Sequence, residues 1–370
     1  MKIKLLFVSF VIVAFATSGL IAQAKNYSKS EIRQKARSVP EEITDDVDRL
    51  SEYLTSDLPG QEAKAYAIYY YTSDAIEYNF EKSDRITINA SREDILEDAL
   101  TEGVGVCQHY SELFHALSKA AGIKSYVIAG YTRQNGKVRS AAHSWNALLI
   151  DDRWRLFDPT WGGGYSQGNE YVHRFTEEYF LMTPDKMIKS HMPYDPLFQF
   201  SNEVITHKDF KEGKFEGHMK MFDDYRQALT RHNELPEQAQ LKEAMERIQR
   251  VWTGQETVEK YYNFLKQNYN VHLANEQVNL HNKAANILNE GVDIFNRYIN
   301  RLNKNRGNYP GGRQAAINEL EKAEQKVKKA KAIFNSVNPP MRLRNSVTKN
   351  KNIANQLLKR IDREKSRLPQ

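Results

Sequence analysis

The sequence predicts an α+β domain, in which a helix that carries a cysteine packs on an antiparallel sheet, followed by an all-α C-terminal region. Two observations predict this order. Residues 125–158 alternate between β-branched or aromatic runs and turn sequences, directly after an amphipathic helical stripe. Beyond Phe210 the apolar residues recur every three or four positions, which is typical of helices. The chain has 370 residues, enough for two domains or for one domain with a large appendage.

The chain begins with a segment typical of a secretory signal peptide. Two lysines precede an apolar run, and Ala22-Gln23-Ala24 places small residues where a signal peptidase requires them. The alternative is an uncleaved anchor, because the apolar stretch approaches the roughly 20 residues that a spanning helix needs. We expect residues 1–24 to be removed, the protein to be periplasmic or secreted, and no transmembrane span to remain.

Helical periodicity follows in the N-terminal part of the mature chain. Residues 25–60 are polar with apolar residues at helical spacing, and Pro59-Gly60 ends the predicted helix. A second amphipathic helix is expected over 61–80. A third begins at Cys107 and ends at Gly122.

Three strands in an antiparallel meander are expected after this third helix. Asn135-Gly136 marks the first turn and Asp151-Asp152 the second. Residues 159–200 are rich in glycine, proline and aromatic residues, which predicts an irregular wrap over the sheet with one short strand at Tyr179–Met182. We therefore expect a domain over residues 61–210, preceded by the helical segment 25–60.

The helical region 211–370 carries two long apolar stripes separated by a glycine-rich breaker at residues 307–312. This pattern predicts a helical hairpin with coiled-coil-like seams, followed by a last helix after Pro339-Pro340. Residues 301–370 hold 18 Lys and Arg against 5 Asp and Glu, whereas the whole chain has a net charge of only +6. No recognition motif accompanies this charge, so we expect no specific nucleic-acid binding. Anionic envelope surfaces or a protein partner are the interactions that remain open.

Cys107 is the only cysteine, so an internal disulfide is excluded and the thiol is either a small buried hydrophobe or a reactive group. Its place at a helix N-terminus favours a thiolate. His143 begins one predicted strand and Asp158 ends the next, so the turn between them brings both to one end of the sheet. An imidazole that takes the thiol proton and a carboxylate that orients the imidazole complete a nucleophilic site. His109 and His115 are the alternative bases.

The residues around these three positions resemble the transglutaminase-like superfamily. The similarity lies in Gly-Val-Cys107, in His143-Ser144-Trp145-Asn146 and in Trp154-Arg155-Leu156-Phe157-Asp158-Pro159-Thr160-Trp161. Tyr179-Phe180-Leu181 and His191-Met192-Pro193 resemble more narrowly the branch that includes the kyphoscoliosis peptidase and related bacterial proteins. The resemblance covers about residues 45–210. It implies a papain-like α+β fold and an acyl-enzyme route with Cys107 as nucleophile, His143 as base and Asp158 as orienting residue.

The chain departs from the pattern of that family at two places. Ser144 stands where the family usually has alanine. Animal transglutaminases use a tryptophan upstream of the cysteine to stabilise the oxyanion, whereas the first tryptophan here is Trp145. The backbone N–H of Cys107 and the hydroxyl of Tyr78 are the expected substitutes, and the loss of one donor is worth about 3 kcal/mol in measured cases. We expect Trp145 and Trp161 to form the walls of the site.

No cofactor or metal is expected. Gly162-Gly163-Gly164 lacks the lysine and the spacing of a phosphate loop, and His173, His191, His207 and His218 are widely spread in the sequence. The sequence therefore predicts an exported cysteine enzyme that transfers acyl groups from peptide or glutamine amides, with hydrolysis favoured over transamidation. The alternative is a catalytically idle binding or scaffold protein whose helical region engages an envelope partner.

Overall fold

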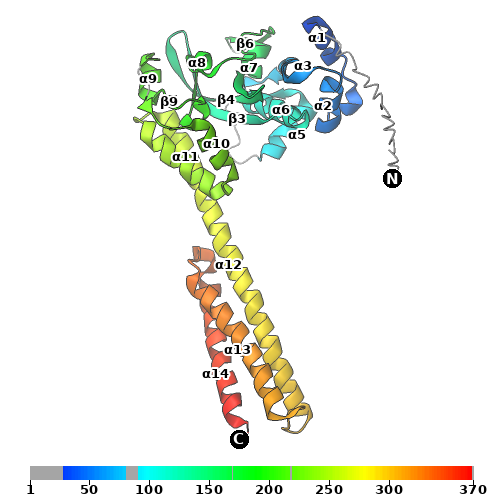
Figure 1. Ribbon diagram of the computed structural model, residues 1–370, viewed down its shortest axis with the longest axis vertical. Helices are drawn as coiled ribbons and strands as arrows, with labels where there is room; N and C mark the ends of the chain where they lie inside the picture. Colours follow the sequence, from blue (N-terminus) through cyan, green and yellow to red (C-terminus); the bar gives the residue numbers. More distant parts are fainter. Residues whose placement is uncertain (1–27, 81–90, 169, 217–218, 369–370) are drawn as a thin grey trace, which may run out of the picture. The chain divides into compact units, whose positions relative to one another are not determined.

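The computed structural model describes residues 28–80, 91–168, 170–216 and 219–368, so the signal segment expected over residues 1–24 lies outside the described residues. The described residues form two compact units, one that ends at Pro193 and one that begins at Tyr194 (Figure 1). The expected boundary between sheet domain and helical region was residue 210. None of the described helices combines the length and the apolar character that crossing a bilayer requires.

The first unit surrounds a central sheet with helices. These helices are α1 (Lys29–Arg37), α2 (Val47–Thr55), α3 (Gly60–Ala75), α5 (Arg92–Glu102), α6 (Cys107–Ala120), α7 (Pro159–Gly163) and α8 (Pro184–Met187). The single helix expected before Pro59 is two helices, α1 and α2. A 3-10 turn after Pro40 and a new N-cap at Asp46, whose side chain accepts two backbone N–H groups, separate them.

The central sheet has the order β5-β4-β3-β8 and is antiparallel throughout. Its strands are β3 (Ser125–Gln134), β4 (Lys137–Ile150), β5 (Arg153–Phe157) and β8 (His191–Pro193). The predicted meander is confirmed as β3-β4-β5. Both turns have the left-handed backbone of tight hairpins, with φ of 49° and 75° at Asn135-Gly136 and of 46° and 59° at Asp151-Asp152. As expected, His143 on β4 and Asp158 after β5 share one end of the sheet.

The segment after the meander contains more strand than expected. β6 (Gly164–Gln167) and β7 (Glu170–His173) form a hairpin, and β8 adds a fourth strand to the sheet. The short strand expected at Tyr179–Met182 is wrong, because this segment makes only an isolated bridge between Leu156 and Met182. β8 escaped prediction because three residues ending in Pro193 are too few to show alternation. A parallel pair, β1 (Glu77–Tyr78) and β2 (Val104–Gly105), precedes α6.

An aromatic cluster joins α3, α6 and the sheet. Tyr69 of α3, Phe114 of α6 and Phe157 of β5 are fully buried, and their ring centroids lie 5.3–6.4 Å apart. Burying each such side chain contributes about 1.5–3 kcal/mol. The cluster therefore holds α6 firmly against the end of β5, where Asp158 follows.

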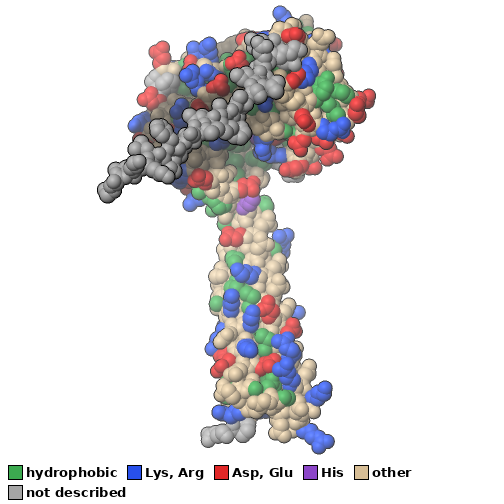
Figure 2. Space-filling model, turned by 45° about the vertical axis from the view of Figure 1, so that its right-hand side comes forward, with side chains coloured by type: hydrophobic (Ala, Val, Ile, Leu, Met, Phe, Trp, Pro, Cys, Tyr) green, Lys and Arg blue, Asp and Glu red, His purple; other side chains and the backbone are tan. Residues whose placement is uncertain are grey.

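The second unit is mostly helical. Its elements are η2 (Pro196–Gln199), β9 (Glu203–Val204), α9 (His207–Glu212), β10 (Met219–Lys220), α10 (Tyr225–Glu234), α11 (Glu237–Val251), α12 (Glu256–Lys304), α13 (Gly312–Ser336), η3 (Met341–Leu343) and α14 (Arg344–Arg367). The predicted stripes pack on one another within one chain, for example through Phe295 of α12 and Leu320 of α13. Lysine and arginine side chains are scattered over the face of this bundle that Figure 2 shows. That its seams form a true coiled coil stays a prediction.

Candidate active site

Cys107 is the first residue of α6, so its thiol lies at the helix N-terminus, where the N–H of His109 bonds the carbonyl oxygen of Val106 and the N–H groups before it have no carbonyl one turn earlier. Gly105 makes this start possible, because a Cβ there would lie 2.4 Å from the ring of His109. The Nδ1 atom of His109 instead accepts the backbone N–H of Val106 at 3.1 Å. His109 is therefore engaged in a hydrogen bond with the backbone at the helix N-terminus.

Asp158 connects the sheet to the helix that follows it. Its Oδ1 accepts the backbone N–H groups of Thr160 and Trp161 at 3.0 and 3.1 Å, as the N-cap of α7. Its Oδ2 lies 2.7 Å from Nε2 of His143. Asp158 is fully buried. The same carboxylate thus begins a helix with one oxygen and orients His143 with the other.

The thiol of Cys107 is hydrogen-bonded to His143, which completes the predicted trio in space. Because Nε2 of His143 bonds Asp158, Nδ1 is the atom that remains for the thiol. The ring of Trp161 lies nearly parallel to that of His143, with centroids 5.5 Å apart, a position that favours a cationic imidazole. The structure therefore brings Cys107, His143 and Asp158 together in the order that the sequence predicts.

Burial and hydrogen bonding compete at each of these groups. Burial alone would raise the pKa of Cys107, but the bonds from His143 and Ser144 hold this pKa below its usual value. Burial would lower the pKa of His143, yet Asp158 and Cys107 raise it to about 10. Burial also opposes ionisation of Asp158, but the two histidines that bond it hold its pKa well below the usual range. These hydrogen bonds therefore favour the thiolate, the imidazolium and the carboxylate over the neutral forms of the three groups.

Ser144, which replaces the usual alanine of the family, contacts the nucleophile. Both its backbone N–H and its hydroxyl donate to the sulfur of Cys107. Its Oγ also lies 2.9 Å from Oγ of Ser111, a fully buried residue of α6. The serine thus supplies one more donor to the thiolate than alanine would.

His191 also belongs to this site, although the sequence indicated it only as a scattered histidine and as part of a resemblance motif, with no role in the site. Its Nε2 lies 3.0 Å from the same Oδ2 of Asp158 that His143 bonds. Together the three side chains offer ligand atoms within 4.8 Å of one another, a group that could hold a metal ion. Their separations of 2.7 and 3.0 Å are those of hydrogen bonds. The sequence signal for His191 was His191-Met192-Pro193, one of the two segments that carried the narrower resemblance to one branch of the family.

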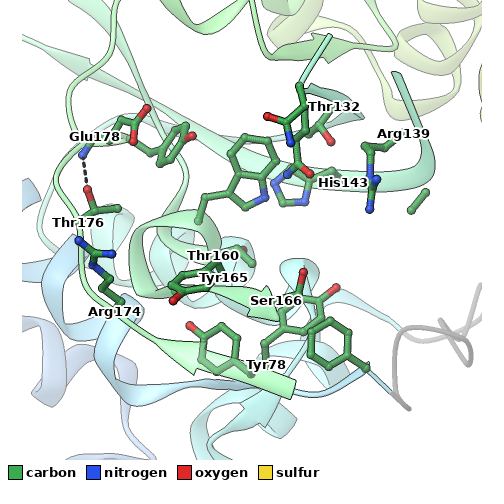
Figure 3. Close-up of a pocket in the computed structure, with 18 of the residues that line it drawn as sticks. Tyr78, Thr132, Arg139, His143, Thr160, Tyr165, Ser166, Arg174, Thr176 and Glu178 are labelled. Carbon is green, nitrogen blue, oxygen red and sulfur yellow. Dashed lines mark hydrogen bonds between the residues drawn. The ribbon is translucent and has the colours of Figure 1, made fainter. Parts of the chain in front are cut away.

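A cavity of about 660 Å³ opens beside His143, within the usual size range of a ligand site. In Figure 3, Arg139 and His143, both on β4, lie on one side of it, and Tyr78 and Ser166 lie on the other. Trp161 lines the cavity, whereas Trp145 is buried behind it against His143 and His191. Cys107 is only 5% exposed and is not among the described residues that form the wall.

Tyr78 lies close enough to Cys107 for the two groups to interact electrostatically. Burial, together with the nearby charges of Cys107 and Asp158, raises the pKa of Tyr78, so its hydroxyl stays protonated and available as a donor. His115, the other alternative base, points elsewhere, with Nδ1 3.0 Å from Oγ of Ser125. That Tyr78 stabilises an oxyanion stays a prediction.

Comparisons with known proteins support the resemblance. Residues 48–159 match the family model of the transglutaminase-like superfamily. The kyphoscoliosis peptidases of Mus musculus and Homo sapiens are each 28% identical to this chain, over 158 and 160 residues that cover 40% of it. Hillarin of Drosophila melanogaster is 25% identical over 127 residues. The match spans 23% of the length of the two peptidases and 16% of hillarin.

Two solved structures are also similar. One is a TGase, at 16% identity and a TM-score of 0.26, covering 43% of this chain and 39% of that chain. The other is the periplasmic domain of TgpA from Pseudomonas aeruginosa, at 22% identity and a TM-score of 0.26, covering 36% of this chain and 49% of that chain. The family match includes Cys107, His143 and Asp158, so the predicted trio lies within the segment, residues 48–159, that matches the transglutaminase-like superfamily.

Proposed function

We propose that the protein is an exported cysteine enzyme that cleaves peptide or glutamine amide bonds through a thioester intermediate. The observation that carries this proposal is the buried chain of hydrogen bonds from Cys107 through His143 to Asp158, next to the cavity. An activated thiolate with a paired imidazolium is the arrangement that acyl transfer requires.

In the first step the sulfur of Cys107 attacks the carbonyl carbon of the amide and a carbon–sulfur bond forms. The carbonyl oxygen becomes an oxyanion, which the backbone N–H of Cys107 and the hydroxyl of Tyr78 stabilise. The carbon–nitrogen bond then breaks as His143 gives its proton to the leaving amine. The product of this step is a thioester on Cys107 and a free amine.

In the second step water attacks the thioester. His143, now neutral, takes a proton from the water, and the carbon–sulfur bond breaks to release a carboxylic acid and the thiolate. Water is favoured over an amine as acceptor because an aqueous envelope supplies it in excess and the chain lacks the upstream tryptophan of animal transglutaminases. The exposed cavity wall at Arg139 and Tyr165 suits a protein or peptide segment as the substrate.

The test is to incubate the protein, from Lys25 onwards, with casein and a fluorescent primary amine. We expect peptide fragments without incorporated label, and no fragments with Cys107→Ala or His143→Gln. Incorporated label without fragments would show transamidation and contradict the preference for water. Export has its own test, because N-terminal sequencing of the envelope fraction should begin at Lys25, whereas an intact Met1 would contradict cleavage.

The second candidate function is a catalytically idle binding or scaffold protein. The observation that favours it is that Cys107 is only 5% exposed and is not among the described residues that line the cavity. In that case the helical region would engage an envelope partner, and the wild type and Cys107→Ala would behave identically. The thiol's iodoacetamide reactivity separates the two functions: rapid alkylation at pH 6, lost in His143→Ala, supports the enzyme, and equal rates support the scaffold.

A further inference from the structure

We propose that His191 is a positioning residue of this site, which donates a hydrogen bond to Asp158 and thereby fixes the carboxylate that orients His143. The inference rests on the proposed function, because it concerns the same reaction. It goes beyond the family match, since His191 lies outside residues 48–159.

The fold places His191 on the opposite side of β3 from His143. β3 pairs with β4 through Gly130 and His143, and it pairs with β8 through Thr132 and His191. The two histidines therefore approach Asp158 from strands on either side of β3. Their ring centroids are 5.6 Å apart.

His191 is sealed from solvent by aromatic rings. It is 1% exposed, and the rings of Trp145, Trp161 and Tyr179 have centroids 5.1, 4.5 and 5.9 Å from its own. Because the ring of His191 is buried, each of its two nitrogens needs a hydrogen-bond partner within the protein.

The hydrogen bonds of His191 define which nitrogen carries the proton. Burial lowers the pKa of His191, so this ring is neutral where His143 is cationic. An ionised carboxylate only accepts, so Nε2 of His191 is the donor to Oδ2 of Asp158. Its Nδ1 then accepts from the hydroxyl of Ser190, 2.8 Å away. The ring is thus a fixed single donor.

This donor completes the set around Asp158. Oδ1 accepts two backbone N–H groups, and Oδ2 accepts from both histidines. Without His191, Oδ2 would keep one acceptor site empty in a fully buried position, which costs free energy and lets the carboxylate rotate or take the proton of His143. Either change makes the imidazolium form of His143 less stable, and this imidazolium stabilises the thiolate of Cys107.

His109, two residues after Cys107 on α6, is another imidazole near this trio, and its Nδ1 accepts the backbone N–H of Val106. The other titratable groups that face the trio keep their charge between pH 5 and 8. They are phenols whose pKa burial raises, namely Tyr69 on α3, Tyr78 on β1, Tyr171 on β7 and Tyr179 in the loop before β8. The charged residues of the cavity wall are Arg139, Arg174 and Glu178. A pH profile of Cys107 reactivity between pH 5 and 8 therefore reports on Cys107, His143, Asp158, His191 and His109, and His109 is unchanged in every variant compared.

The experiment measures the rate of Cys107 alkylation by iodoacetamide from pH 5 to 8 in full-length variants. His191→Phe keeps a buried ring but removes the donor, whereas His191→Gln can place an amide N–H near the position of Nε2. At pH 6 we expect His191→Phe to react at least about tenfold more slowly than the wild type, toward the behaviour of an ordinary thiol, and His191→Gln to stay within about threefold. His207→Phe removes an equally buried histidine from the second unit and should leave the profile unchanged.

The outcomes separate this inference from the proposed function. A wild type that reacts as an ordinary thiol at pH 6 overturns both. An activated wild type with a His191→Phe profile within twofold of it overturns the positioning role alone. The positioning role is also overturned if Cys107 is alkylated equally slowly in His191→Phe and His191→Gln while both variants unfold at midpoints near that of the wild type. Ring packing rather than hydrogen-bond donation would then matter.

Discussion

The reactivity of Cys107 depends on neighbours that differ in chemical kind. The helix N-terminus contributes backbone N–H groups, His143 contributes a proton and a charge, and Ser144 contributes a hydroxyl. The serine is the least expected, because its position in the strand next to His143 suggests a passive small residue. Its hydroxyl instead lies between the nucleophile and Ser111.

Ser144→Ala should make the thiolate of Cys107 less stable without damaging the fold. A hydrogen bond to a charged group contributes about 1.5–3 kcal/mol, so we expect the pKa of Cys107 to rise and its alkylation at pH 6 to slow about tenfold. The measurement is the pH profile of iodoacetamide alkylation. Ser118→Ala is the matched control, because Ser118 lies on the same helix, is fully buried, and its hydroxyl has no hydrogen-bond partner among the described residues. Identical profiles for Ser144→Ala and the wild type would contradict this role.

At the scale of elements, β3 sets the distance between the two histidines that bond Asp158. Gly130 is one of the residues of β3 that pair with both neighbouring strands, opposite His143 of β4 and Pro193 of β8. A Cβ at this position would lie 2.2 Å from the carbonyl oxygen of Met192 and 2.4 Å from the ring of Trp145. The glycine therefore permits the close approach of β8 that brings His191 to Asp158.

Gly130→Ala should push β8 and Trp145 away from β3. Overpacking of this kind costs about 1–3 kcal/mol, and we expect both a lower free energy of unfolding in urea and slower alkylation of Cys107 at pH 6. Gly122→Ala serves as the control. Gly122 has a φ of 77° and open space around it, so alanine there should lower stability through backbone strain but leave the alkylation rate unchanged. A Gly130→Ala protein with wild-type alkylation would show that β8 does not position the site.

At the scale of the whole molecule, the proposed ion pair of Cys107 and His143 makes the stability of the fold depend on pH. In the proposed pair, a Cys107 thiolate with a His143 imidazolium, the folded protein holds one proton, on His143, up to the pKa of His143 of about 10. The unfolded pair carries two protons below about pH 6.5, one between about pH 6.5 and 8.5, and none above. Stability from the pair is therefore lost as the pH falls below about 6.5, is constant up to about 8.5, and is lost again as the pH rises further.

Cys107→Ala should remove the pH range in which the stability contributed by the pair is constant. Without the thiol, the unfolded chain carries no proton on this pair above about pH 6.5 while His143 keeps its own, so stability should fall by up to about 1.4 kcal/mol per pH unit. Urea unfolding followed by tryptophan fluorescence measures this, because Trp145, Trp154 and Trp161 lie in the first unit. The difference between variant and wild type cancels the other titrating groups. Parallel curves from pH 6.5 to 8.5 would contradict the ion pair.

The sequence by itself determined the local parts of this protein. Apolar periodicity and turn chemistry act over a few residues, so the helix that begins at Cys107, the meander and the turn that joins His143 to Asp158 were all predictable. Only the tertiary structure decided the hairpin of β6 and β7, the addition of β8 to the sheet and the place of His191, 33 residues from Asp158 in sequence. Such pairings arise from packing across a sheet between distant segments, and no local pattern records which segments will meet.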